Sequence, residues 1–71
     1  MNTLHIPMSN CTIIANFNDR ATIYSLAVMY NVRGRSYASP IVMDNLSNET
    51  QNTVNSAILD HLEMKKYEPR S

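Results

Sequence analysis

The chain has 71 residues, enough for one small domain, since independent domains usually contain about 100–150 residues. Apolar residues make up 44% of it and charged residues 17%, so its composition is not that of a disordered chain. Six Lys and Arg balance six Asp and Glu, so no net charge draws the chain to nucleic acid or to an anionic membrane. The single cysteine, Cys11, excludes an intrachain disulfide, and we expect a reducing, cytoplasmic setting. No signal-peptide pattern and no apolar run of about 20 residues occurs, so neither secretion nor a membrane span is expected.

The N-terminal third begins with a polar stretch. Residues 1–10 contain few apolar side chains, and we expect a flexible arm that precedes a single domain at residues 11–67. Residues 12–17, TIIANF, are short and rich in β-forming side chains, which predicts a strand. Asn18 and Asp19 then supply either a turn or the N-cap of a helix.

Residues 20–32 have two interpretations. At helical spacing they place four residues on one face: Ile23, Leu26, Ala27 and Tyr30. With strand alternation they line one face with five residues: Tyr24, Leu26, Val28, Tyr30 and Val32. Asn31 tolerates the left-handed conformation that ends helices, and Ser39 with Pro40 suits the start of another helix, so we predict a helix. A strand would require Pro40 to lie on a sheet edge or at a bulge.

The C-terminal region predicts a helix over residues 48–66. Ser47 or Asn48 can cap it, and Pro69 closes it within a tail at residues 68–71. Its apolar stripe has five members: Val54, Ala57, Ile58, His61 and Leu62. We expect His61 to pack through its ring on this helix face.

Within residues 19–41, the segment 25–37 resembles the helix-turn-helix family. Five residues occupy the places of the first helix and the turn: Leu26, Ala27, Tyr30, Asn31 and Val32. The resemblance implies that Arg33, Arg35 and Ser36 lie at the start of a recognition helix, in which Tyr37 is buried.

We therefore expect a mainly α fold, a helix-turn-helix-like domain with a short N-terminal strand and a long C-terminal helix. The alternative is α+β, with a three-stranded antiparallel sheet packed on the C-terminal helix. That alternative places Arg33, Gly34 and Arg35 at a hairpin tip and leaves an edge strand for pairing with a partner. Because so small a domain buries only about 60% of its unfolded surface, we expect a partner or a homodimer to complete its stability.

The residues that can carry chemistry are few. Cys11, His5 and His61 match no zinc-ligand spacing, and Gly34 is the only glycine, so no phosphate-binding loop is present. We expect no metal, no cofactor and no enzymatic activity.

One concentrated basic and aromatic segment predicts a binding role, because arginine suits carboxylates or phosphates and tyrosine adds contact area. The candidate partner-binding residues are Arg33, Gly34, Arg35, Ser36, Tyr37, Lys65 and Lys66. In size and composition the chain resembles small bacteriophage proteins that bind and regulate host RNA polymerase. We expect a small transcription-regulatory protein that docks on such a partner in a bacterial cytoplasm. The alternatives are a helix-turn-helix DNA-binding regulator and an inhibitor of a host defence enzyme.

Overall fold

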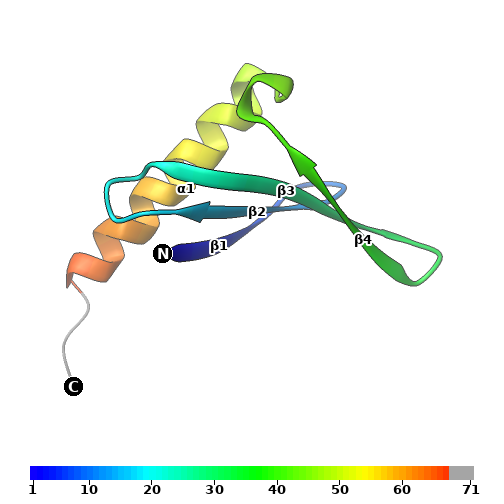
Figure 1. Ribbon diagram of the computed structural model, residues 1–71, viewed down its shortest axis with the longest axis horizontal. Coiled ribbons are helices and arrows are strands. Elements are labelled where there is room, and N and C mark those ends of the chain that lie inside the picture. Colours follow the sequence, from blue (N-terminus) through cyan, green and yellow to red (C-terminus); the bar gives the residue numbers. More distant parts are fainter. Residues whose placement is uncertain (68–71) are drawn as a thin grey trace.

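The computed structural model describes residues 1–67, with side chains as far as residue 64, as a four-stranded antiparallel sheet with one long helix on one face (Figure 1). The predicted tail at residues 68–71, with Pro69, lies outside the described residues. The elements in chain order are β1 (Asn2–Pro7), β2 (Thr12–Phe17), β3 (Ile23–Val32), β4 (Arg35–Ile41), the short 3-10 helix η1 (Met43–Asn45) and α1 (Asn48–Tyr67). No helix in this part of the chain has the length and apolar content to span a bilayer.

Each strand pairs with the next one along the chain, so the spatial order is β1-β2-β3-β4. The connection from β2 to β3 is built around Asn18, whose Oδ1 accepts from the backbone N–H groups of Arg20 and Thr22 at 2.8 and 2.9 Å. Of the two roles expected for Asn18, the turn is therefore the correct one. Ala21 in this turn has a φ of 65°, which is uncommon for a residue with a Cβ.

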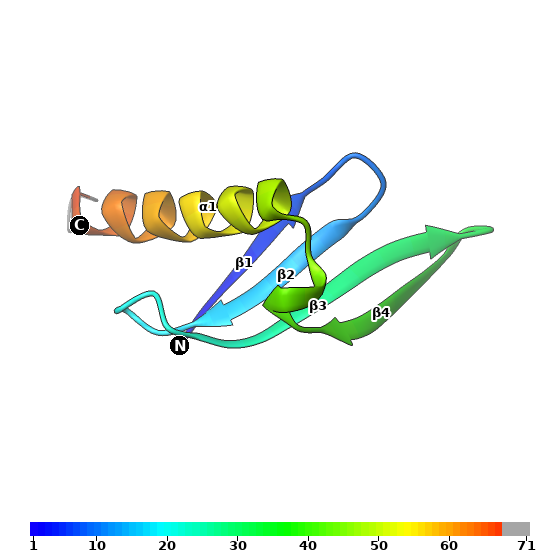
Figure 2. The same cartoon turned by 90° about the horizontal axis from the view of Figure 1, so that it is seen from above.

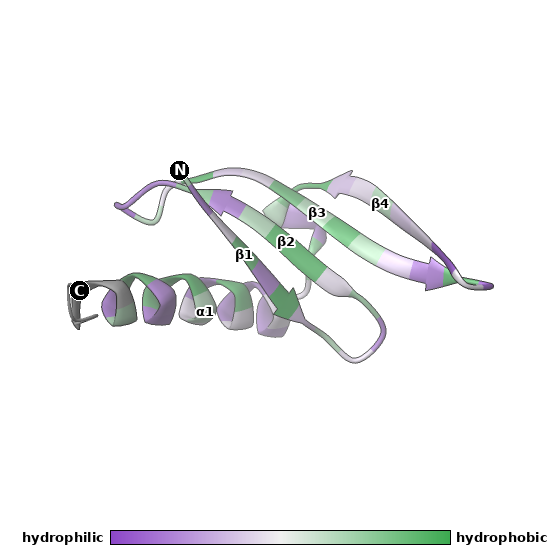
Figure 3. Ribbon diagram, turned by 90° about the horizontal axis from the view of Figure 1, so that it is seen from below, coloured by the Kyte–Doolittle hydropathy of each residue, from purple (hydrophilic) through white to green (hydrophobic). Residues whose placement is uncertain are grey.

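The core lies between α1 and the sheet face that it covers (Figure 2). Alternation along β2 buries Ile13, Ala15 and Phe17, while α1 contributes Val54 and Ile58 one turn apart. The remaining buried apolar residues are Ile6 and Leu26. Figure 3, coloured by hydropathy, shows apolar residues along β2 and in the middle of β3, and polar residues at the tip of the β3–β4 hairpin.

The C-terminal helix is confirmed. It begins at Asn48, and Ser47 is the cap, because its Oγ accepts from the N–H of Thr50 at 3.2 Å. Gln51 adds a bond from its Nε2 to the carbonyl oxygen of Leu46 at 3.0 Å. His61 packs edge-on against Phe17 with ring centroids 5.7 Å apart, as expected for a ring on the apolar stripe.

The expectation of a mainly α fold is wrong, whereas the α+β alternative agrees with the structure, with four strands in place of three. Residues 23–32 form β3 because both neighbours, β2 and β4, pair with that strand, which overrides its helical spacing. Asn31 lies inside β3 and ends no helix. Pro40 lies on the edge strand β4, where its missing N–H leaves no ladder bond unmade.

The helix-turn-helix expectation is wrong for the same reason. Residues 25–37 run through β3, its turn and the first part of β4, so neither the predicted first helix nor the recognition helix is present there. Tyr37, expected to be buried, is exposed.

The predicted flexible arm at residues 1–10 contains β1, so that expectation is wrong for residues 2–7. They pair along β2, and the side chain of Asn2 donates to Asp19 Oδ1 at 3.0 Å. Ile6 is buried in the core, which explains why so polar a segment is held in place.

Candidate functional site

The outer half of the β3–β4 hairpin projects from the rest of the sheet. Pairing between β2 and β3 reaches Met29 and stops there, so residues 30–37 form a two-stranded ribbon with no third strand. Figure 2 shows this ribbon extending past the first turn of α1, with the tip well clear of the helix. We call residues 30–37 the ribbon.

The tip of the ribbon is a two-residue turn between the paired residues Val32 and Arg35. Arg33 has a φ of 52° and Gly34 a φ of 82°, and positive φ at both positions is the signature of a type I′ turn. This turn matches the natural twist of two antiparallel strands, so it holds both arginines at the extreme end of the molecule. A Cβ at Gly34 would meet nothing within 4 Å, so only the backbone conformation constrains that position.

Two tyrosines stack on one face of the ribbon. Tyr30 and Tyr37 are register partners, with ring centroids 5.8 Å apart and ring planes 25° apart. Side chains alternate along β3, so Tyr30 and Val32 lie on the same face as the buried Leu26, which is the face that α1 covers. Their partners on β4, Tyr37 and Arg35, lie on that face as well. On the ribbon that face is uncovered: Tyr30, Tyr37 and Val32 are 37%, 45% and 46% exposed.

The opposite face of the ribbon is polar. Ser36 donates from its Oγ to Asn31 Oδ1 at 2.7 Å, which ties β3 to β4 one pair from the tip. The two faces therefore differ, and only the tyrosine face combines apolar area with a cation.

The ribbon has an unbalanced positive charge. Between Asp19 and Asp44 the sequence contains three arginines and no acidic residue. Within the described part of the chain no ion pair engages Arg33 or Arg35, and both are exposed. Their guanidinium groups are available to carboxylates or phosphates of a partner.

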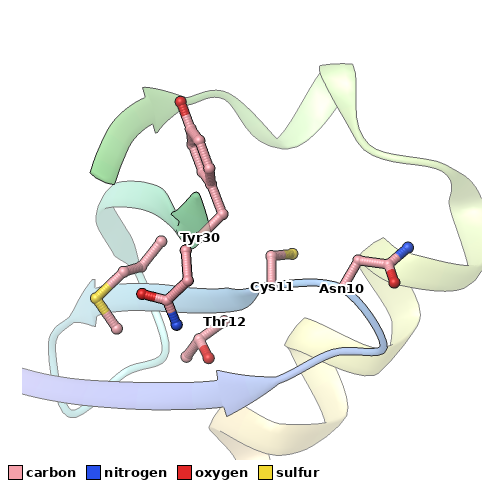
Figure 4. Close-up of a pocket in the computed structure, with 6 residues that line it drawn as sticks. Asn10, Cys11, Thr12 and Tyr30 are labelled. Carbon is pink, nitrogen blue, oxygen red and sulfur yellow. The ribbon is translucent and has the colours of Figure 1, made fainter. Parts of the chain in front are cut away.

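A small hollow lies beside the root of the ribbon, with a volume of about 270 Å³. Asn10, Cys11 and Thr12 line it from the β1–β2 connection and the start of β2, while Tyr30 lines it from β3 (Figure 4). A partner that covers Tyr30 would therefore also meet the turn before β2.

The structure brings five of the predicted site residues together and separates the other two. Arg33, Gly34, Arg35, Ser36 and Tyr37 all lie on the ribbon. Lys65 and Lys66 lie in the last turns of α1, and their side chains are outside the described residues. That end of α1 points away from the ribbon tip (Figure 2), so the lysines do not belong to this surface.

Sequence analysis missed Tyr30 and Val32 as site residues. The favoured interpretation put Tyr30 on a helix and Val32 just after its end. Strand alternation places the two on one face, and the pairing of β3 with β4 adds Tyr37 to that face.

The side chains that could perform chemistry are dispersed. His5 lies on β1, Cys11 lines the hollow, and His61 packs on Phe17. Among the described residues no three His, Cys, Asp or Glu side chains are grouped in a way that could hold a metal ion.

Comparison with protein families, with curated proteins and with solved structures finds no match to this chain.

Proposed function

We propose that this chain is a non-enzymatic binding protein that docks on a partner protein through the tyrosine face and the arginine tip of the ribbon. The observation that carries the proposal is the exposed Tyr30–Tyr37 stack beside Arg33 and Arg35 on a projecting hairpin. Tyrosine and arginine are among the side chains most enriched at the energetic centres of protein interfaces. Cross-strand pairing holds this surface in one conformation, which lowers the entropy lost on binding.

Charge favours a protein partner over duplex DNA. DNA-binding proteins gain affinity through phosphate contacts, often about six to ten of them. The ribbon offers two arginines, and the whole chain has no net charge. Two cations beside an apolar aromatic pair instead suit a partner surface that presents carboxylates around an apolar patch.

A role in transcription, with RNA polymerase as the partner, is the most specific form of this proposal. It rests on the size and composition of the chain and on the binding surface described above. Docking near a site where the polymerase handles nucleic acid would let a small protein act by occlusion, since the ribbon needs only an acidic, partly apolar surface.

The experiment is co-elution of the purified chain with purified bacterial RNA polymerase, followed by titration of the complex at two salt concentrations. We expect a stable complex with weak salt dependence, because Tyr30, Val32 and Tyr37 supply apolar contact that salt does not screen. A gel shift of duplex DNA at low salt is the second arm. Retardation of DNA with a steep salt slope, and no complex with the polymerase, would contradict the proposal.

A further inference from the structure

We propose that the free edge of β4 pairs with β4 of a second copy of this chain, antiparallel and centred on Tyr37, to form a continuous eight-stranded sheet. The dimer goes beyond the proposed function, because it uses the edge of the hairpin and leaves the tyrosine face open.

The sheet has two edge strands, and they differ in how open they are. The helix α1 packs closest to β1, and Asn2 at the start of β1 is tied to Asp19. Among the described elements, β4 makes substantial contacts with β3 alone. An exposed edge strand presents unpaired N–H and C=O groups that another strand can complete.

The register determines which groups of β4 point outward. In a two-residue hairpin the pair next to the turn, here Val32 and Arg35, is hydrogen-bonded, and hydrogen-bonded pairs then alternate with non-hydrogen-bonded ones. Ser36, Ala38 and Pro40 therefore occupy non-hydrogen-bonded positions toward β3. Their main-chain groups face the open side, where only Pro40 lacks a donor.

This pattern is self-complementary about Tyr37. In an antiparallel pair centred there, Ser36 of each copy lies opposite Ala38 of the other, so the two pairs exchange four main-chain hydrogen bonds. Tyr37 lies opposite Tyr37 of the second copy at the non-hydrogen-bonded position, where side chains are closest. Because Tyr30 already stacks on Tyr37, the row becomes four tyrosines across the dimer.

Charge is complementary in the same register. Arg35 lies opposite the uncharged Ser39, so no like charges meet within the paired strands. Arg33, in the turn before β4, lies at the end of the interface where β4 of the second copy leads to the exposed Asp44. Within the described residues neither Arg33 nor Asp44 has an ion-pair partner of its own. Pairing thus places a free cation of one copy and a free carboxylate of the other at the same end of the interface.

The first test measures mass by size-exclusion chromatography with light scattering over a range of concentrations. We expect the wild-type chain to approach twice the monomer mass of 8.1 kDa as concentration rises. Ala38→Pro removes an outward N–H without breaking the pairing to β3, so we expect a monomer with an unchanged circular dichroism spectrum. Ala38→Ser keeps the N–H and should still dimerise. A wild-type chain that is monomeric throughout, or an Ala38→Pro variant that still dimerises, would overturn the inference.

The second test does not depend on how the proline variant folds. In a Cys11→Ser background, Tyr37→Cys places two thiols at a pair whose Cα atoms are about 4.5 Å apart, within disulfide reach. We expect a covalent dimer on mild oxidation from Tyr37→Cys and none from Tyr30→Cys, one strand further in. Equal crosslinking of the two variants would overturn the register. Neither test uses a partner protein, so the dimer and the proposed function can fail separately. A chain that is monomeric but binds RNA polymerase would overturn only the dimer. A chain that dimerises but does not bind RNA polymerase would overturn only the proposed function.

Discussion

Tyr30 and Tyr37 lie opposite each other across β3 and β4, with ring centroids 5.8 Å apart, at the point where the hairpin leaves the sheet. Their contact replaces, on the ribbon, the packing that α1 supplies to the rest of that face. The pair therefore both stiffens the ribbon and adds exposed aromatic surface to it.

The stack should show measurable coupling. An aromatic pair contributes about 0.5–1.5 kcal/mol beyond the area that it buries, so the effects of Tyr30→Ala and Tyr37→Ala on unfolding should be non-additive by that amount. Urea unfolding of the two single variants and the double variant, at concentrations where the chain is monomeric, measures it. Tyr24→Ala combined with Tyr37→Ala is the matched control and should be additive, because Tyr24 lies six residues from Tyr30 along β3. Additivity in both cycles would contradict the stack.

The turn at the ribbon tip should respond to backbone preference alone. Gly34→Ala puts a Cβ on a residue with a φ of 82°, and we expect a loss of about 1–2 kcal/mol although the space around it is open. Arg33→Asn should have the opposite sign, since asparagine adopts positive φ more readily than arginine. Thermal unfolding measures both. A Gly34→Ala variant as stable as the wild type would argue against the type I′ turn.

The helix cap provides a prediction with an internal control. Ser47→Ala removes the acceptor for the N–H of Thr50, and we expect a loss of about 1 kcal/mol. Ser56→Ala changes an exposed serine inside α1 and should have no effect or stabilise slightly, because alanine is the better helix former. Equal effects of the two substitutions on the denaturation midpoint would exclude the cap.

The small core makes the fold sensitive to one residue. Phe17 is fully buried between the sheet and His61, and truncating such a ring costs about 3–5 kcal/mol. At about 0.05–0.15 kcal/mol per residue, a chain of this length has a total free energy of unfolding of about 4–11 kcal/mol, so Phe17→Ala should remove a large part of it and lower the thermal midpoint steeply. His61→Ala removes only the outer ring and should stay folded. Far-UV circular dichroism distinguishes the two results.

The elements that could be predicted from sequence are those whose local signals agree. In α1 the cap at Ser47 and the stripe that includes Val54 and Ile58 indicate the same helix, and the strand at residues 12–17 has β-forming residues throughout. In β3 the local signals conflict. Its strand alternation and its helical spacing share Leu26 and Tyr30, and pairing on both sides decided between them.

The residues at the tip of the ribbon could be singled out from the sequence, but their hairpin conformation could not. Arg33 and Arg35 are conspicuous in the sequence as a concentrated basic segment. The pairing of β3 with β4 places them at the end of the projecting ribbon. The usual signal for a type I′ turn is Asn-Gly or Asp-Gly, and here an arginine occupies the first position. The hairpin was the less favoured interpretation because Asn31 suits the end of a helix and Ser39 with Pro40 suits the start of another.

The most direct test of the ribbon as the docking surface is the affinity of the Arg33→Ala/Arg35→Ala double variant for RNA polymerase, measured beside Arg20→Ala. Arg20 is an exposed cation in the β2–β3 turn, outside the ribbon, so its removal controls for a general loss of charge. We expect the double variant to bind at least about tenfold more weakly, since charged hydrogen bonds at an interface contribute about 1.5–3 kcal/mol, and Arg20→Ala to bind like the wild type. Equal binding by the double variant and the wild type would contradict the account.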